Sequence, residues 1–361
     1  MSDANELISF IASMSGEGNL RVEENLGEGY VRLRVSEAER RQAKHDIQHV
    51  EDIVIEMLRN ARDAGADKVY LATTKEDGVR TLVFLDNGSG VPQDMQERIF
   101  DARVTSKLES MKMDRWGVHG RGMALFSIKQ NTDEARVVAS DVDLGSVFKV
   151  SVATDRLGER ADQSSWPQAV KDEDGHYVCA RGPHNIIRAA CEFALEELRA
   201  CEVYLGSPSE IAATLHAQAS SRLDASRLLF IDDEAELPVV DRLGLASDAE
   251  DFIRICSGLG LEMSERTAHR ILAGQIKPVR GVTARLLRER DSSSHASAPV
   301  DLAKDRRGLR IAKDDMSQFS RAVERDFNDL ASRYYLSLCG DPKIRVSRDR
   351  ITVTFDLAKE E

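Results

Sequence analysis

The sequence predicts an α/β fold of the α+β type, and three patterns support this prediction. Apolar residues recur at helical spacing between Ile47 and Ala61. Two strand-like runs, 69–73 and 79–85, are joined by the turn sequence Glu-Asp-Gly. Two further strand-like runs, 135–140 and 146–153, follow a second helical segment. Helices and strands therefore alternate within the first 155 residues.

The elements that precede these strands are a hairpin and a long helix. Residues 20–35 have the pattern of a hairpin that turns at 27–29. Ser36 is a suitable N-cap for a helix that we expect to continue to about residue 64. A short helix is predicted over 93–100 and another over 123–129. Residues 101–121 are rich in Lys, Arg, Gly and Met, and we expect a mobile loop there.

Beyond residue 155 the sequence predicts a helix-rich mixed region. We expect three domains, over 1–155, 156–290 and 291–361. The second begins with a polar, loop-like stretch at 156–183. Its expected elements are helices at 184–199, 209–222 and most of 248–290, with short strands or apolar pieces at 202–205, 228–231 and 239–240. The third has a linker at 291–299, a helix around 314–338 and a hairpin at 344–355.

Composition excludes several classes of protein. Hydrophobic residues make up 42% and charged residues 31% of 361 residues, as in globular proteins. No apolar run reaches the roughly 20 residues of a membrane span, and no secretory signal is recognisable. The five cysteines form no C-x-x-C pair, which argues against zinc and against a disulfide framework. We therefore expect a cytoplasmic protein without a membrane partner.

The charge is unevenly distributed along the chain. The formal net charge is −12, which argues against indiscriminate binding to nucleic acid. Residues 266–325 nevertheless contain 14 Lys and Arg against 7 Asp and Glu, a local charge of +7. This region is a candidate face for DNA or another anionic partner.

The helix before residue 65 carries an unusual polar stripe. Glu56, Asn60 and Asp63 fall within about 60° of one another around a helix axis, while the apolar residues cluster on a different side. Gly65 follows as a stop signal. A solvated polar face is the simple interpretation. The alternative is a functional edge that carries an acid, an amide and a second acid.

Two glycine-rich segments follow. Asp86-Asn87-Gly88-Ser89-Gly90 comes directly after a predicted buried strand. There an aspartate can accept a hydrogen bond from an exocyclic amine, and glycines allow close approach to a flat ring. The alternative is a type I′ turn at Asn87-Gly88. Residues 117–122, Gly-Val-His-Gly-Arg-Gly, precede a predicted helix, where free N–H groups bind phosphate. This segment fits neither a Rossmann nor a Walker A motif.

These motifs, in this order, resemble those of the GHKL superfamily of ATPases, which includes gyrase, the ninety-kilodalton heat-shock chaperones, histidine kinases and MutL-type mismatch-repair proteins. The resemblance covers residues 45–153. Glu56, Asn60, Asp63 and Ala64 match an E-x-x-x-N-x-x-D-A box, and 86–90 and 117–122 match D-x-G-x-G and G-x-x-G-x-G boxes. Gly145-Ser146 is similar to a late Gly-Thr. The sequences at 60–71 and 105–108 resemble the MutL branch most.

The resemblance implies a two-layer α/β sandwich of the GHKL (Bergerat) type that binds ATP and Mg²⁺. Glu56 would activate water, Asn60 would hold Mg²⁺, Asp86 would bind the adenine amine, and Lys107 or Arg121 would neutralise charge. For Asp63, a structural role that ties down the adenine loop is an alternative. The nucleotide-binding residues would be Asn60, Asp63, Ala64, Asp86, Gly88, Gly90, Val91, Thr105, Ser106, Lys107, Gly117, Val118, His119, Gly120, Arg121, Gly122, Met123 and Ser146.

The implied function is slow ATP hydrolysis that serves as a conformational or dimerisation switch, with a homodimer and a DNA or protein partner bound through residues 156–361. The second half departs from MutL proteins, because their phosphate-contacting lysine domain is not recognisable; Lys277 and Lys304 are the available candidates. Two alternatives remain. One is a protein kinase or anti-sigma-like regulator. The other is a nucleotide-gated DNA-binding regulator, for which residues 264–290 are either a helix-turn-helix or an ordinary αα-hairpin.

Overall fold

The computed structural model describes most of the chain, in two compact units. The described residues are 22–106, 112–114, 116–119, 122–198, 200–223, 233–287, 319–325, 327–328, 336–340, 342–346 and 351–359. The units are Met1–Leu287 and Arg288–Glu361. The predicted boundary at 155/156 falls inside the first unit. Within the described residues, no helix combines the length and the apolar character that a membrane span requires.

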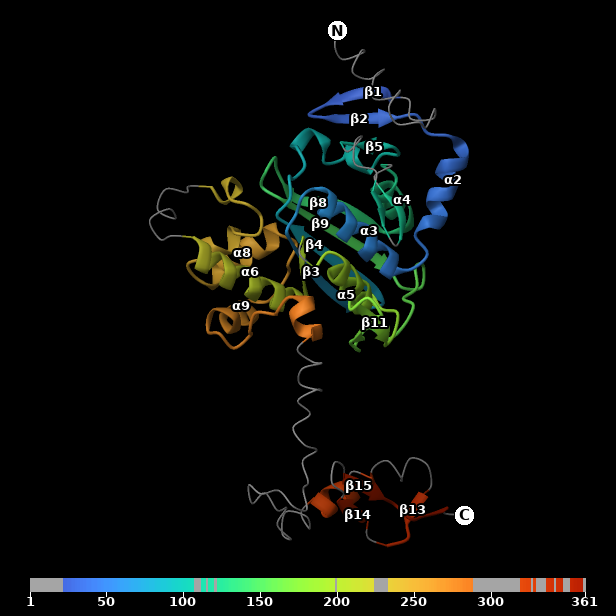
Figure 1. The fold of residues 1–361 in the computed structure, drawn as a ribbon. Helices are drawn as coiled ribbons and strands as arrows, with labels where there is room; N and C mark the ends of the chain where they lie inside the picture. The colour runs from blue at the N-terminus through green and yellow to red at the C-terminus, as the bar shows by residue number, and fades with distance from the viewer. Residues whose placement is uncertain are drawn as a thin grey trace. The chain divides into compact units, whose positions relative to one another are not determined.

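The first unit is built around a mixed five-stranded sheet (Figure 1). Its strand order is β12 (Glu202–Gly206), β3 (Lys68–Glu76), β4 (Val79–Asp86), β9 (Ser146–Ala153) and β8 (Glu134–Ser140). β12 pairs parallel to β3, and the other neighbours are antiparallel. The predicted strands are confirmed. The sheet also receives a strand from beyond residue 155.

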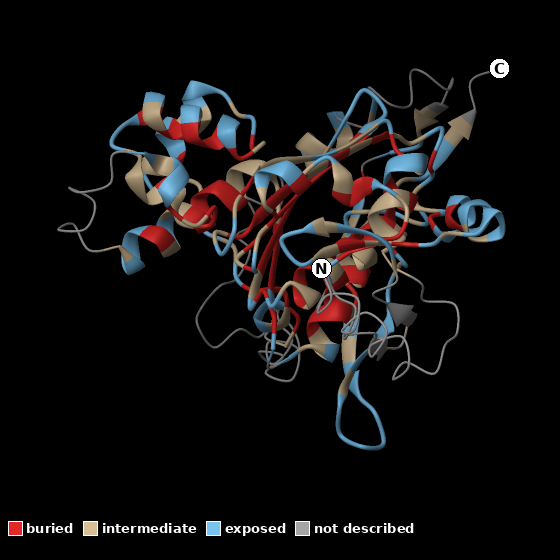
Figure 2. Ribbon diagram, turned by 90° about the horizontal axis from the view of Figure 1, so that it is seen from above, coloured by how far each residue is buried: buried red, intermediate tan, exposed pale blue. Residues whose placement is uncertain are grey.

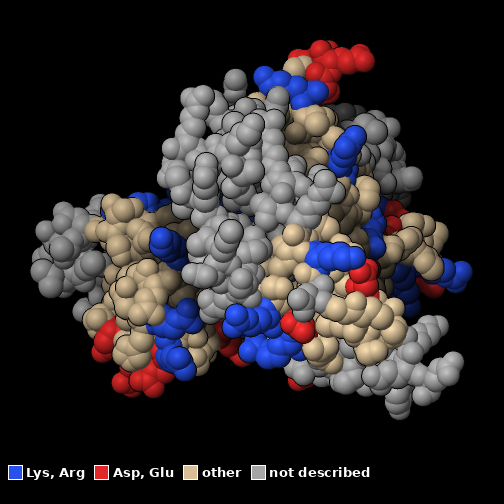
Figure 3. Space-filling view, turned by 90° about the horizontal axis from the view of Figure 1, so that it is seen from below, with Lys and Arg blue, Asp and Glu red and all other residues tan. Residues whose placement is uncertain are grey.

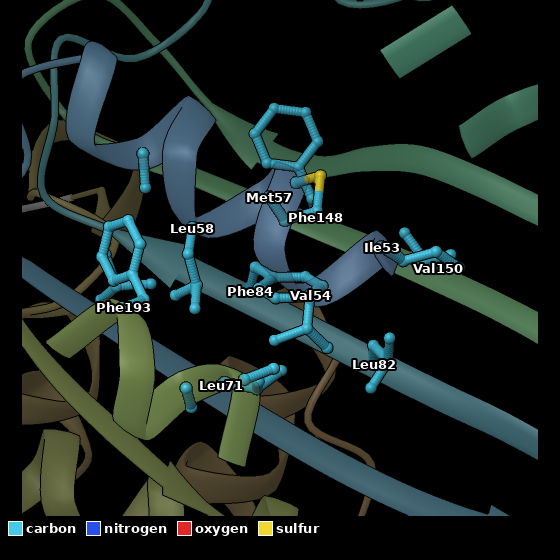
Figure 4. Close-up of a cluster of buried hydrophobic side chains, with 14 of the residues drawn as sticks. Ile53, Val54, Met57, Leu58, Leu71, Leu82, Phe84, Phe148, Val150 and Phe193 are labelled. Atoms are coloured by element: carbon cyan, nitrogen blue, oxygen red, sulfur yellow. The ribbon is translucent and has the colours of Figure 1, made fainter. Parts of the chain in front are cut away.

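Both faces of this sheet are buried, because its central strands are apolar on both sides. Leu71 and Phe84 contribute to one core cluster, while Tyr70 and Leu85 contribute to a second, as the two-residue period of a strand requires. The first cluster packs against α3 (Val50–Asp63) and α5 (Ile186–Glu196), as Figure 4 shows for Val54, Leu58 and Phe193. The second packs against α6 (Pro208–Arg222), α8 (Ala249–Gly258) and α9 (Glu265–Leu272). The sheet is therefore a buried layer between helices (Figure 2).

The N-terminal part contains the predicted hairpin but not the predicted single helix. β1 (Val22–Gly27) and β2 (Tyr30–Leu33) form the hairpin, and Ser36 caps α2 (Glu37–Asp46). The chain then breaks at 47–49 before α3 begins. The Asp52 carboxylate accepts hydrogen bonds from the backbone N–H groups of Gln48 and His49, which caps a new helix. The expectation of one helix from Ser36 to residue 64 is therefore wrong.

Residues 93–131 contain more regular structure than predicted. The predicted short helix is a pair of 3₁₀ turns, η1 (Gln93–Met95) and η2 (Arg98–Phe100). The expected loop at 101–121 contains β5 (Val104–Thr105), which pairs with β2, and the antiparallel hairpin of β6 (Lys112–Asp114) and β7 (Gly117–His119). α4 (Ala124–Asn131) follows. The prediction of a loop is wrong for these short strands.

The region after residue 155 also differs from the prediction. Residues 156–183 include a hairpin of β10 (Gln168–Lys171) and β11 (Tyr177–Arg181). Residues 239–240 form a turn between η3 (Glu234–Glu236) and η4 (Arg242–Leu245), and 228–231 lie outside the described residues. Ile271 of α9 joins the second core cluster, whereas Val282 and Leu286 of the helix at 282–287 join the first. These two helices pack on opposite sides of the sheet, so the described residues of 264–287 form neither a helix-turn-helix nor an αα-hairpin.

The second unit contains short pairs of strands. β13 (Leu336–Leu338) pairs with β16 (Leu357–Lys359), and β14 (Lys343–Val346) pairs with β15 (Ile351–Thr354). The latter pair confirms the predicted terminal hairpin. Residues 319–325 and 327–328 are helical, whereas the end of the predicted helix around 314–338 is strand β13. The predicted linker at 291–299 lies outside the described residues.

Candidate functional site

A cavity of about 510 Å³ opens beside α3 in the first unit. Its walls are α3, the ends of β4 and β9, strand β5 and the start of α4. It is lined by twelve residues that the sequence motifs predicted: Glu56, Asn60, Asp63, Ala64, Asp86, Gly90, Val91, Thr105, Ser106, Gly122, Met123 and Ser146. The motifs, which are up to 90 positions apart in the sequence, thus meet at one cavity.

Gly88 is the one other predicted nucleotide-binding residue whose surroundings are described, and it is absent from this lining. Gly88 packs against Ala64, the C-cap residue of α3. Gly117, Val118 and His119 form strand β7. Lys107, Gly120 and Arg121 lie outside the described residues, as does Lys304. Lys277 is exposed and does not line the cavity.

Glu56 projects from the middle of α3 into the cavity. The helix holds it there because its opposite side, including Val54 and Leu58, is fully buried in the core. The Glu56 side chain is 24% exposed, and its Oε1 accepts a hydrogen bond from Arg59 Nη1 at 2.7 Å. Burial raises the pKa of Glu56, and this effect outweighs the opposing charge and hydrogen bond of Arg59. A carboxylate with a raised pKa is suited to accept a proton.

A buried ion network surrounds this carboxylate, and the sequence motifs did not predict it. Arg59 also forms a two-pronged pair with Asp114, through Nε at 2.9 Å and Nη2 at 3.0 Å. Arg62 contacts Asp63 at 2.9 Å, Asp114 at 3.1 Å and Glu197 at 3.1 Å. A sequence signal was available for Arg59, because a residue three positions after Glu56 lies next to it on the helix surface.

Asp86 lies at the other end of the cavity, at the end of β4. It is 3% exposed, and its Oδ1 accepts a hydrogen bond from the Gly88 N–H at 2.8 Å. The Asn87 side chain accepts hydrogen bonds from the N–H groups of Asp67 and Lys68, which fastens this loop to the start of β3. Neither Asn87 nor Gly88 has a positive φ. The alternative of a type I′ turn is therefore wrong.

The glycines of this loop are required by contacts within the protein itself. A β-carbon on Gly88 would lie 2.8 Å from the Ala64 carbonyl oxygen. A β-carbon on Gly90, which has φ +71°, would lie 1.8 Å from the Asp141 carbonyl oxygen. The sequence motif predicts that both glycines admit a flat ring. The structure provides a different steric reason, which is that the loop packs between α3 and the β8–β9 turn.

Ser140 also helps to build the cavity, and the sequence motifs did not predict it. Its hydroxyl accepts a hydrogen bond from the Val91 N–H at 2.8 Å and donates one to the Gly145 carbonyl at 2.8 Å. Its Oγ also lies 3.2 Å from the Oγ of Ser146. Ser140 thereby joins the aspartate loop to the start of β9. No motif marks it, because it acts through tertiary contacts alone.

The start of α4 closes another side of the cavity. Met123, Ala124 and Leu125 line it, and the first N–H groups of a helix have no partners within that helix. Gly122 is fixed against the neighbouring strand, because its carbonyl accepts the Arg103 N–H at 2.8 Å and a β-carbon on it would lie 2.7 Å from the Val104 carbonyl. Such a helix start favours a phosphate group.

Tyr30 and Trp116, two of the aromatic residues that line the cavity, were also not predicted. Tyr30 comes from β2, and burial raises the pKa of its phenol. Trp116 comes from the β6–β7 hairpin, and its ring stacks on Phe193 of α5 with centroids 6.3 Å apart. The N-terminal hairpin and the β6–β7 hairpin therefore both border the cavity.

The donor set of the cavity suits a magnesium–nucleotide complex better than a bare metal ion. Its polar lining offers the amide oxygen of Asn60, which is a hard ligand. Among the described residues, a cluster of three potential metal ligands occurs only at Asp172, Asp174 and His176, which are exposed on the β10–β11 turn. A magnesium ion in the cavity would therefore take its remaining ligands from phosphates and water.

Comparison with known proteins agrees with this geometry. The model of the family described as "Histidine kinase-, DNA gyrase B-, and HSP90-like ATPase" matches residues 47–140. The chain is also similar to DNA mismatch repair protein MutL of Staphylococcus aureus, with the same figures for strains Newman, JH1 and N315: 28% identity over 136 residues, which is 35% of this chain and 20% of each relative. The chain thus spans about a fifth of the length of these relatives. Residues 47–140 thus match the model of the GHKL ATPases, as the sequence motifs predicted.

Proposed function

We propose that this protein binds Mg-ATP in the α3 cavity, hydrolyses it slowly and uses its nucleotide state as a conformational or dimerisation switch. One observation carries the proposal: Glu56, Asn60 and the buried Asp86 line a single cavity of about 510 Å³. That volume lies within the range of small-molecule sites. The matching family model supports the ATPase assignment.

The roles follow from the chemistry of each side chain. Asp86 would accept a hydrogen bond from the adenine amine, and the start of α4 would donate N–H groups to phosphates. Asn60 would hold Mg²⁺, which neutralises phosphate charge when bound. Glu56 would orient the attacking water and accept its proton, for which the raised pKa suits it. Thr105 and Ser106 would contribute hydroxyl groups.

Calorimetric titration of ATP with Mg²⁺, followed by a phosphate-release assay, tests these roles separately. Asp86→Asn keeps an oxygen for the Gly88 N–H but replaces the second oxygen with a donor, so we expect ATP affinity to fall at least tenfold. Glu56→Gln should retain binding and lose about 10²–10⁴-fold in hydrolysis. Glu76→Gln, at the exposed end of β3, is the matched control and should alter neither. Wild-type protein that binds no ATP, or Glu56→Gln that hydrolyses at the wild-type rate, would refute the proposal.

A second candidate function is nucleotide-gated contact with DNA. The supporting observation is an open groove along α9 that includes Arg266 and Arg270, followed by the exposed residues Lys277 and Arg280. Several groups of Lys and Arg side chains are visible in Figure 3. Binding to a fluorescent DNA duplex should weaken steeply with salt if several phosphates are contacted. Affinity that is independent of salt, or unchanged in the double variant Arg266→Ser/Arg270→Ser, would exclude this candidate.

A further inference from the structure

Arg59 makes three contacts that join Glu56 to the β6–β7 hairpin. Its side chain is 3% exposed. Nη1 donates to Glu56 Oε1 at 2.7 Å, while Nε and Nη2 donate to the two oxygens of Asp114 at 2.9 and 3.0 Å. The planar guanidinium fixes the relative directions of these bonds, so both carboxylates are oriented by one rigid group.

Asp114 is itself held firmly in place. Its side chain is 6% exposed, and it receives additional hydrogen bonds from Arg62 Nη1 at 3.1 Å and from the Trp116 N–H at 3.0 Å. Burial opposes ionisation of Asp114, but these hydrogen bonds and the charge of Arg59 outweigh it and hold its pKa below the usual range. The hairpin is therefore fixed to α3 by an ionised carboxylate.

We propose that Arg59 is a positioning residue that orients the Glu56 carboxylate and, through Asp114, ties that orientation to the position of the β6–β7 hairpin. The inference rests on the proposed function, in which Glu56 is the base. A displacement of the hairpin would pull Asp114 away from Arg59 and so release the guanidinium that holds Glu56. The alternative is that the ion network only stabilises the fold.

The charges around Glu56 allow a positioning role of Arg59 to be distinguished from a purely structural role of the ion network. Arg59 favours the ionised form of Glu56, whereas Asp114 and Asp46 of α2 disfavour it. A second cavity of about 250 Å³ also borders Glu56. Its other charged or titratable lining residues are Asp46, Glu51, Asp52, Arg160, His184, Arg188 and Glu192. Removing the charge of Arg59 should raise the pKa of Glu56, and removing the charge of Asp114 should lower it.

The experiment compares Arg59→Gln, Arg59→Lys and Asp114→Asn with wild type. The Glu56 carboxyl carbon is followed by NMR in nucleotide-free protein, with Glu56→Gln to assign the signal, and the pH profile of kcat is measured in parallel. We expect Arg59→Gln to raise the pKa of Glu56 and Asp114→Asn to lower it, while both reduce the plateau of kcat at least tenfold. Arg59→Lys, which retains the charge, should restore the pKa of Glu56 but not the plateau, because a lysine cannot engage both carboxylates in the same way.

Arg62→Gln is the matched control, because Arg62 contacts Asp114 from the same helix but pairs with Asp63 and Glu197 instead of Glu56. It should move the pKa of Glu56 less than Arg59→Gln does. Equal movement in the two variants, or an unchanged plateau of kcat in Asp114→Asn, overturns the inference. If Arg59→Gln does not fold, Arg59→Lys and Asp114→Asn still decide the question. A wild-type protein without ATPase activity would instead refute the proposed function, and the two failures are thus distinguishable.

Discussion

Gly145 lies so close to Asp86 that a β-carbon on the glycine would be 2.1 Å from the aspartate carbonyl oxygen. The φ angle of Gly145 is also positive, at +78°. The strand pairing explains the contact, because Asp86 ends β4 at the position where its partner Ser146 begins β9. The turn before β9 must therefore pass directly over the carbonyl of the residue that we assign to adenine recognition.

Gly145→Ala should consequently destabilise the first unit by about 3 kcal/mol or more, because it adds a backbone clash to the strain of a left-handed residue. Gly78→Ala is the matched control, since Gly78 has φ +79° and a β-carbon added to it would meet no atom within 4 Å. Gly78→Ala should reduce the free energy of unfolding by only about 1–2 kcal/mol. Urea unfolding measures both values, and equal losses would show that the close approach to Asp86 is unimportant.

Trp116 should report nucleotide binding through its fluorescence. It lines the cavity and stacks on Phe193, so a ligand that fills the cavity would change the surroundings of the indole. The second tryptophan, Trp166, lies under the Arg285 guanidinium at 3.8 Å and does not line the cavity. Titration with Mg-ATP should change the emission of wild type and of Trp166→Phe. The change should disappear in Trp116→Phe, and its persistence there would contradict the site.

Glu159 should contribute stability that disappears in acid. Burial raises its pKa, but hydrogen bonds from Arg80 and Lys75 and their charges outweigh this effect and leave the pKa lowered. A lowered folded-state pKa means that the stabilisation is complete above the unfolded value of about 4.5 and is lost as pH falls through the folded value. Glu159→Gln should reduce the free energy of unfolding by about 1–3 kcal/mol at pH 7, and by progressively less below pH 4.5. Urea unfolding at pH 7, 5 and 3 measures this. A difference between the two proteins that stays constant with pH would contradict the assignment.

Leu58 should help to hold α3 against the sheet. Its side chain is fully buried between α3, the sheet and α5 (Figure 4). Leu58→Ala should reduce the free energy of unfolding by about 2–5 kcal/mol, through lost burial and a residual cavity. Leu198→Ala, at a residue that is 48% exposed, should stay within about 0.5 kcal/mol of wild type. Thermal and urea unfolding of the two variants provide the comparison.

The central strands and twelve lining residues could be predicted from the sequence because they depend on local patterns. Short runs rich in apolar residues mark β4 and β9, and the spacing of Glu56 and Asn60 places both on one side of a helix. The break at 47–49 was missed because the apolar stripe continues through Ile47, within the break, to Val50 directly after it. An acid three residues after His49 was the available signal for a new helix start.

The β10–β11 hairpin could also have been predicted, from its turn sequence. Asp174-Gly175 lies between its two strands, and such a pair commonly marks a hairpin. Other features could not be found by local reasoning. The parallel pairing of β12 with β3 and the pairing of Arg59 with Asp114 join residues 134 and 55 positions apart, respectively. Such contacts are determined by the assembled core and leave no periodic trace.

The parallel strand β12 makes the segment that carries the site inseparable from the chain that follows it. A fragment that stopped at residue 155 would lack β12, so one edge of β3 would have no paired strand. It would also expose Tyr70, Leu85 and Val147, which the helices of the second half now cover. An unpaired strand edge beside an apolar sheet face is a template for association with other chains. Dissection of this protein must therefore cut after residue 287, and exchange of residues 47–140 between proteins as an independent module is opposed by the same constraint.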